Sequence, residues 1–285
     1  MNCYTTIRYI ATHILIVIMA SYPCMIGVGE LAATHELHIF LGPINPNTET
    51  VERYQQVVEE WNQKYPSTLG MKPCLLTLIF RDQHGKPTNV TVMQSARYVR
   101  SNDDQYVIAQ AMADAKWFTD HGFDVVRRKI EASAYGISGI PQTVQEVAQY
   151  PSKYFEFHIK VGRKDASDTS AISEQEIEQL NNASFVCSKE YNIPVPLSYN
   201  NLKDKFNLDG EGHQRFLNVR FRGLGIKDIA PKLEDIKSTI AEQTRFKVLK
   251  VISEYVWYDD NTAMDHGWID YSPAELENLT TYWQQ

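Results

Sequence analysis

Two short stretches of the chain, HELHIFLGP at residues 35–43 and YFEFHIKVG at residues 154–162, share the order Glu, apolar residue, His, Ile. Each alternates apolar and polar residues, which is the period of a strand with one buried face. A strand that occurs twice constrains the fold strongly. The elements that follow the first copy are then expected to follow the second copy as well.

The segments after the first copy predict a helix, two strands, a second helix and a last strand. Apolar residues recur at helical spacing in both helical segments, and Gly122 is a typical stop signal for the second. This strand and helix order is that of a ferredoxin-like unit. The predicted helices are residues 50–61 and 103–121, and the predicted strands after the first are residues 74–80, 90–99 and 123–133.

The second copy is followed by a similar series. Ser173 and Glu176 have the spacing of a capping box, which predicts a short helix start. Further along, residues 231–243 read as a helix with Pro231 in its first turn. Residues 192–212 are irregular and carry no placed element. The strands predicted in this half are residues 184–188, 214–223 and 245–258.

The last strands of the two halves align, with Phe123 opposite Phe246, Val125 opposite Val248 and Glu131 opposite Glu254. We therefore predict an α+β fold of tandem duplicated ferredoxin-like (βαββαβ) units with antiparallel sheets, whose open faces can pack face to face. The predicted organisation is an apolar N-terminal segment at 1–33, units at 34–133 and 152–258, a linker at 134–151 and a C-terminal extension at 259–285.

The N-terminal segment differs in composition from the rest. It has one early basic residue, Arg8, an apolar stretch over 14–28 and small residues at Ala32 and Ala33, an order that resembles a secretory signal. Pro23 and the short apolar length favour a signal over a membrane anchor. An upstream translation start is the other alternative. The protein is thus expected to be secreted or membrane-associated if this segment is a signal, and cytoplasmic otherwise, with membrane contact only through this segment.

The overall charge limits the partners. A formal net charge of -7 disfavours nonspecific nucleic-acid binding, which needs a basic surface. No Cys or His residues have the spacing of a zinc site, so neither a metal nor another cofactor is expected. The composition, 43% hydrophobic and 22% charged, is that of a globular protein.

Polar residues of the two repeated strands point away from the face that packs on helices, because side chains alternate along a strand. His38 and His158 are the candidate catalytic residues, since histidine transfers protons near neutral pH. Ser95 or Arg97 of the first half are expected to join this face if the register of their strand allows it. The candidate ligand-binding residues are Glu36, Glu156, Lys160, Asn218, Arg220 and Arg222.

The stretch HIFLG resembles the strand motif of the two-histidine phosphoesterases, a bilobal family in which each lobe supplies His, an apolar residue, and Thr or Ser. The resemblance implies hydrolysis or formation of cyclic phosphates. The chain departs from the motif at its third position, which is Phe40 in one copy and Lys160 in the other, so the hydroxyl that grips the phosphate is missing.

Two classes of function follow from these residues. The first is an enzyme or binder that acts on a small anionic ligand, bearing phosphate or carboxylate, in a polar cleft between the halves. Arg220 and Lys160 would hold the anion. The alternative is a noncatalytic protein-interaction module that uses the groove between the halves or its sheet edges. Histidines that converge favour the first class, and separated histidines favour the second.

Overall fold

The computed structural model describes residues 32–66, 69–81, 87–135, 139–165, 168, 170–204 and 215–265. The predicted N-terminal signal lies outside these residues, except for its last two positions. No helix in the described ranges has the length and apolar character needed to span a membrane.

The strands of the first half are β1, β2, β3 and β4, and those of the second half are β5, β6, β7 and β8. Their bounds are Thr34–Leu41, Lys72–Arg81, Pro87–Arg100 and Val125–Ser133, then Tyr154–Arg163, Leu197–Asn200, Arg215–Phe221 and Phe246–Asp259. The longer helices are α2 (Thr48–Lys64), α3 (Asp104–Asp120), α5 (Glu174–Tyr191) and α7 (Ile226–Gln243); short ones are α4 (Val144–Val147), α6 (Asn201–Asp204) and the 3-10 helix η1 (Thr262–Asp265).

The strands of both halves form one closed barrel in the order β1-β3-β2-β6-β7-β5-β8-β4. The prediction of tandem ferredoxin-like units with separate sheets is therefore wrong. Strand β2 pairs with β6, and β4 pairs with β8, so the edges expected to remain open are joined between the halves. Backbone N–H and C=O groups at an open edge have no partner in the sheet, and closure supplies one.

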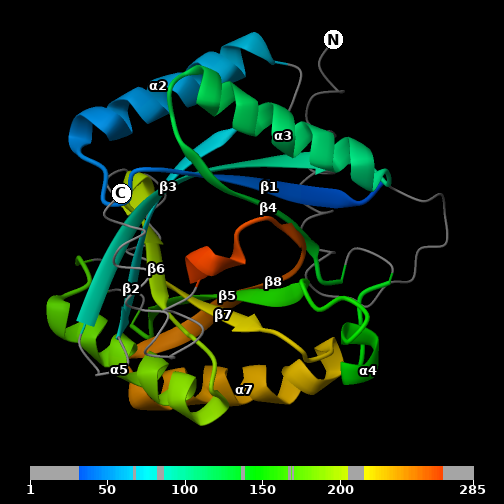
Figure 1. Ribbon diagram of the computed structural model, residues 1–285. Helices are drawn as coiled ribbons and strands as arrows, with labels where there is room; N and C mark the ends of the chain where they lie inside the picture. The colour runs from blue at the N-terminus through cyan, green and yellow to red at the C-terminus, as the bar shows by residue number, and fades with distance from the viewer. Residues whose placement is uncertain are drawn as a thin grey trace, which may run out of the picture.

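Two helical layers cover the outside of the barrel (Figure 1). Helices α2 and α3 lie over β1 and β3, where Tyr54, Trp61 and Phe118 pack with Ile39. On the opposite side α5 and α7 bury apolar residues of β5 and β7 in a larger cluster. The strands under these helices thus present mainly apolar residues outward, so their alternate residues are left to fill the barrel interior.

Helix α5 shows where local patterns misled the sequence analysis. The predicted strand at 184–188 is wrong, because these residues belong to α5. Leu180, Ala183 and Cys187 recur at helical spacing and are all buried against the sheet. The missing strand is β6, which lies in the segment that carried no prediction.

Helix α7 also differs at its start. It begins at Ile226, earlier than predicted, so Pro231 lies inside the helix rather than in its first turn. A proline at this depth removes one helical hydrogen bond. Ile229, Leu233, Ile236 and Ile240 nevertheless form a buried stripe, which holds the helix on the barrel.

The chain after β8 turns back into the barrel (Figure 1, orange-red). Met264 of η1 is 4% exposed and packs on Phe40 and Val92, which point inward from β1 and β3. Part of the barrel interior is therefore apolar and filled. The polar part lies further along the same strands.

The capping box of α5 is formed as predicted, and it carries an ion pair. Glu176 binds the Ser173 backbone N–H at 2.9 Å, and its other oxygen accepts from Arg163 Nε at 2.7 Å. We expect Glu176→Ala to lower the free energy of unfolding by about 2 kcal/mol, because the variant loses both a cap and charge-assisted hydrogen bonds. Urea unfolding measures the change. Glu174→Ala, an exposed first-turn variant, is the control and should change it by about 0.5 kcal/mol or less.

The ion pair between Arg163 and Glu176 also predicts how the free energy of unfolding depends on pH. The hydrogen bond from Arg163, against the effect of burial, lowers the pKa of Glu176 from 4.5 to about 2. A lowered pKa in the folded state gives stability that is present above pH 4.5 and is lost as the pH falls toward 2. The stability gap between wild type and Glu176→Ala should therefore narrow over this range. A gap that does not change with pH would contradict the ion pair.

Candidate functional site

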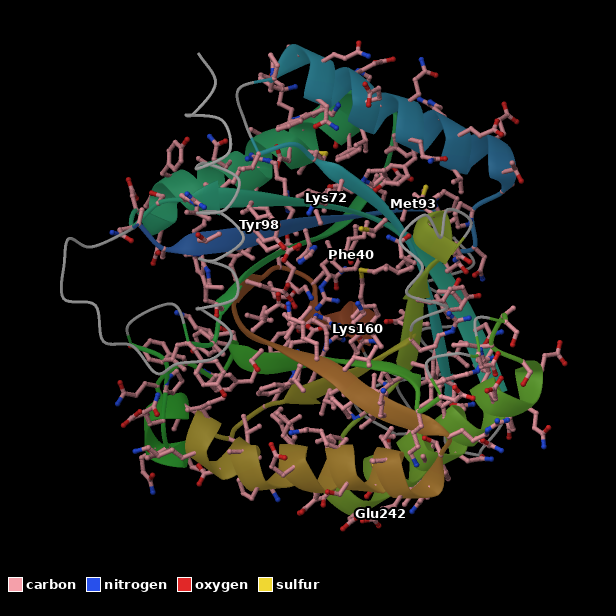
Figure 2. The ribbon with its side chains drawn as sticks, turned by 180° about the vertical axis from the view of Figure 1, so that it is seen from behind. Phe40, Lys72, Met93, Tyr98, Lys160 and Glu242 are labelled. Carbon is pink, nitrogen blue, oxygen red and sulfur yellow. The ribbon has the colours of Figure 1, made fainter. Side chains whose placement is uncertain are left out.

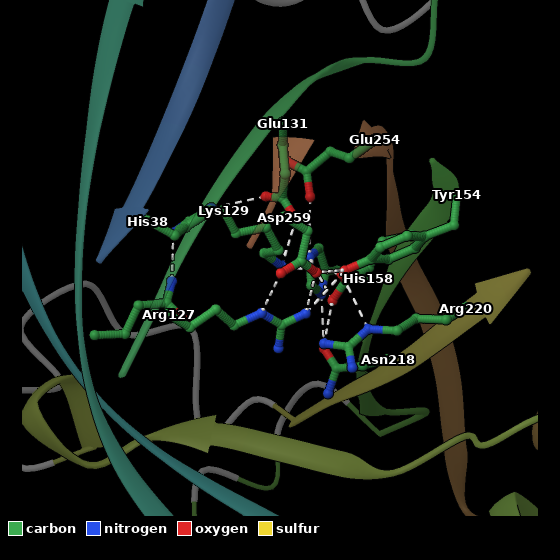
Figure 3. A network of polar contacts seen from close by, with 12 residues as sticks. His38, Arg127, Lys129, Glu131, Tyr154, His158, Asn218, Arg220, Glu254 and Asp259 are labelled. Carbon is green, nitrogen blue, oxygen red and sulfur yellow. Dashed lines mark hydrogen bonds and ion pairs between the residues drawn. The ribbon is translucent and has the colours of Figure 1, made fainter. Parts of the chain in front are cut away.

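The barrel interior holds a network of charged residues drawn from both halves (Figure 3). On β1, Glu36 is opposite Tyr98 and Glu131, and His38 is opposite Ala96 and Lys129. On β5, the register places Glu156 opposite Arg220 and Glu254, and His158 opposite Asn218 and Ile252. Residues directly opposite in antiparallel strands share a face, so these side chains point inward together.

His38 is sealed within the network. Its Nε2 lies 2.7 Å from Glu131 Oε2, and its Nδ1 contacts the side-chain amide of Gln94. The residue is 7% exposed. With both ring nitrogens engaged, His38 is placed to orient Glu131 rather than to meet a ligand.

His158 makes the equivalent contact in the second half. Its Nε2 lies 2.9 Å from Glu254 Oε2, and its Nδ1 lies 2.6 Å from Asn218 Oδ1. Each half therefore pairs a histidine of its first strand with a glutamate of its last strand. The two histidines differ in their exposure to solvent, since 25% of the His158 side chain is exposed and 9% of the His38 side chain.

Lys129 joins the halves. Its Nζ lies 2.5 Å from Glu131 Oε1 and 3.0 Å from Glu156 Oε2. Arg220 reaches the same carboxylate, with contacts of 3.0 Å to each oxygen of Glu156. Three carboxylates and two cations are thus packed with the histidines, and all but His158 are almost fully buried.

The electrostatic surroundings favour charged histidines. Burial would lower the pKa of His38, but the Glu131 carboxylate outweighs it and the pKa is raised. Burial opposes the charged form of His158 too, while the hydrogen bond to Glu254 raises its pKa to about 10. For Glu131, burial would raise the pKa, and Lys129 and His38 instead lower it to about 2. Burial and then the charge of Glu131 raise the pKa of Glu254.

A second buried group lies beside this network. Arg127 Nε donates to Asp259 Oδ1 at 2.9 Å, and Tyr154 Oη donates to Asp259 Oδ2 at 2.8 Å. The Arg127 guanidinium also lies 5.2 Å from the centre of the Phe40 ring. Lys129 Nζ lies 5.9 Å from the centre of the same ring, so the apolar part of the barrel at Phe40 borders both charged groups.

The structure brings most of the predicted site residues into the barrel. Asn218 binds His158, Arg220 binds Glu156, and Arg222 lies 4.1 Å from the centre of the Tyr154 ring. Lys160 projects inward, as Figure 2 shows. Arg97 is different, because it points outward and its Nε lies 2.5 Å from Asp114 of α3. The expectation that Ser95 or Arg97 face the site is wrong, since the register places Ala96 beside His38.

Several residues in and around the network were not predicted from the sequence. Lys129 and Glu131 alternate with apolar or solvent-facing residues along β4, which is the signal that marks an inward face. The alignment of Glu131 with Glu254 was a further signal, because both prove to be histidine partners. The other missed residues are Gln94, Tyr98, Arg127, Tyr154, Lys250 and Asp259.

Exposure increases along β5 and β8 away from Lys129. Glu156 is 1% exposed, whereas His158 and Lys160 are half-buried. On β8, Glu254 is buried, Ile252 is half-buried and Lys250 is exposed. We call Lys160 and Lys250 the lysine rim. Solvent thus reaches the network from the side of the lysine rim.

One part of the network has donor atoms suited to a metal ion. Glu131, His158 and Glu254 each offer one ligand atom, and these atoms lie within 4.8 Å of one another. They come from three strands that are distant in the sequence, so no spacing motif announces them.

Comparisons with known proteins do not assign a family. No protein-family model matches the chain, and no curated protein matches it. Among solved structures, a dye-decolorizing protein from V. cholerae is 11% identical over 79% of this chain and 94% of its own, with a TM-score of 0.26.

Two further solved structures match at a similar level. A heme-binding protein from Thermus thermophilus is 11% identical over 90% of this chain and 96% of its own, with a TM-score of 0.25. A mutant chlorite dismutase from Candidatus Nitrospira defluvii is 10% identical over 89% and 97%, with a TM-score of 0.24. Similarity this weak carries no functional argument, so the function has to be inferred from the barrel interior itself.

The Arg127 group provides a test of the buried contacts. We expect Asp259→Ala to lower the free energy of unfolding by about 3–5 kcal/mol, because it leaves the Arg127 charge buried with a partner removed. The Asp259 side chain is 0% exposed. Its neighbour Asp260 pairs with Arg128, whose side chain is 35% exposed, so Asp260→Ala is a matched control that should cost about 1 kcal/mol. If urea unfolding shows that Asp259→Ala and Asp260→Ala lower the free energy of unfolding equally, the buried Arg127–Asp259 ion pair is contradicted.

Proposed function

We propose that the barrel binds a small anionic molecule at the lysine rim, next to His158. The proposal rests on one observation, which is that Lys160 and Lys250 are directly opposite each other on β5 and β8. An anionic group of a ligand bound between the two ammonium groups would attract both of them. Phosphate and carboxylate both have the required charge.

The deeper cations are less suited to hold the anion. Arg220 and Lys129 are almost fully buried beside Glu156, whereas Lys160 is half-buried and Lys250 is exposed, so an anion from solvent reaches the rim first. This moves the expected anion contact from Arg220 to the lysine rim. Asn218, Arg220 and Glu156 then have the role of holding the histidine side of the site in place.

His158 is the histidine that reaches this ligand in our proposal. Its ring is partly exposed, and its Nε2 hydrogen bond to Glu254 can be exchanged for one to a bound molecule. Such a contact suits both binding and proton transfer by an enzyme. His38 acts indirectly, through Glu131. The alternative, a noncatalytic interaction module, is weakened because the closed barrel leaves no unpaired edge among the described strands.

Thermal unfolding in the presence of candidate anions tests the proposal. We expect phosphate, pyrophosphate, cyclic phosphates, sugar phosphates or small carboxylates to include a compound that raises the melting temperature of the wild type by several degrees at saturating concentration. The shift should be lost in the double variant Lys160→Gln, Lys250→Gln. Metal chelator is present throughout, so that the result concerns the anion alone.

The control is Lys116→Gln, which removes one positive charge from a side chain that is 73% exposed on α3. It should retain the full shift. A shift of equal size in the rim double variant would show that the anion binds elsewhere. If no compound in the series shifts the wild type, anion binding at the rim is wrong.

A further inference from the structure

We infer that Glu131, His158 and Glu254 form a binding site for a divalent transition-metal ion. The three residues lie on β4, β5 and β8, and one donor atom of each lies within 4.8 Å of the others. Ligand atoms on opposite sides of such an ion are about 4–4.4 Å apart, given bonds of about 2.0–2.2 Å. Small side-chain rotations would therefore bring the three donors to a common centre.

The orientation of the His158 ring is the first support. Asn218 Nδ2 donates to the Pro196 carbonyl at 3.3 Å, which turns Asn218 Oδ1 toward the ring. Nδ1 of His158 must then carry the hydrogen that Oδ1 accepts at 2.6 Å. Metal-binding histidines are held in this way, with one ring nitrogen donating to a fixed oxygen and the other facing the ion.

The surroundings of Nε2 are the second support. This atom lies 2.9 Å from Glu254 Oε2 and 3.7 Å from Glu156 Oε1. Carboxylate oxygens only accept, so a positive particle has to lie between them and Nε2. A proton on Nε2 can be shared with only one carboxylate oxygen. A metal ion bound to Nε2 can bind several carboxylate oxygens at once.

The carboxylates themselves are the third support. Glu254 is buried, and in the described part of the chain its ion-pair partner is His158 alone. Glu131 Oε1 lies 2.5 Å from Lys129 Nζ but accepts no hydrogen bond of good geometry. This oxygen is in a residue that is 1% exposed. Two buried carboxylates that face one another are stabilised when a divalent cation lies between them.

The donor set indicates the kind of ion. One imidazole nitrogen with carboxylate oxygens suits Mn²⁺, Fe²⁺, Co²⁺ or Zn²⁺. His38 orients Glu131 through its Nε2, and Asn218 orients His158, so two of the three ligands are fixed by hydrogen bonds. The exposed side of His158 leaves a path by which the ion can enter. The inference goes beyond the anion site and does not depend on it.

Metal binding can be measured directly on the full chain. The protein is first treated with chelator, exchanged into a buffer without phosphate or carboxylates, and titrated with Co²⁺ and with Mn²⁺. We expect one equivalent to bind, the d–d absorption bands of Co²⁺ to shift and become more intense than those of the aqueous ion, and the melting temperature to rise. Glu254→Gln and His158→Gln should each weaken binding at least about tenfold.

The control variant is Asp114→Asn. Asp114 is also a buried carboxylate, but it pairs with Arg97 on the outer face of the sheet, so this variant should bind the metal like the wild type. Equal binding by Glu254→Gln and wild type would place the ion elsewhere and overturn the inference. Absence of saturable binding to the wild type would overturn it too. If the ligand variants do not fold, the Co²⁺ spectrum of the wild type decides, since ions on exposed carboxylates alone keep the weak bands of the aqueous ion.

Discussion

The interior of the barrel depends on one lysine. Lys129 is 3% exposed, and its ammonium group contacts Glu131 on its own strand and Glu156 on β5. Strands β4 and β5 are not neighbours, because β8 lies between them, so the contact passes over the inward face of β8. A buried ammonium ion without partners costs several kcal/mol. Lys129 reaches both carboxylates because β8 pairs with β4 of the first half and with β5 of its own half.

The histidine pairs follow from this arrangement. Lys129 fixes Glu131, which receives His38, and it shares Glu156 with Arg220. His158 lies at the border of this buried group, where exposure rises toward the lysine rim. The repeated histidine of β1 and β5 therefore has two different surroundings. One copy is part of the packed interior, and the other is accessible to small molecules or ions.

The residues that face inward could be predicted in part from the sequence, because alternation along a strand is a local property. Glu36, His38, Glu156 and His158 were all assigned to the inward face on that basis. The closure of the barrel could not be predicted in this way. It depends on pairing between β2 and β6, and β6 has only four residues within a proline-bearing segment. Local patterns carry no information on which distant edges pair.

The same reasoning explains the missed site residues. Metal ligands were expected at short spacing, whereas Glu131, His158 and Glu254 are brought together by the pairing of β8 with β4 and β5. Arg97 was misplaced because its register relative to His38 was not known. A strand register shifted by one residue moves every side chain to the other face, so residue type alone does not settle which arginines enter the site.

A double-mutant cycle between Lys129 and Glu156 tests the central claim most directly. Unfolding free energies are measured for the wild type, Lys129→Met, Glu156→Gln and the double variant. A contact between these side chains over β8 predicts a favourable coupling energy of about 1–3 kcal/mol. Additive effects, with a coupling energy of about zero, would mean that the two side chains do not meet, and would contradict the contact that joins the two halves inside the barrel.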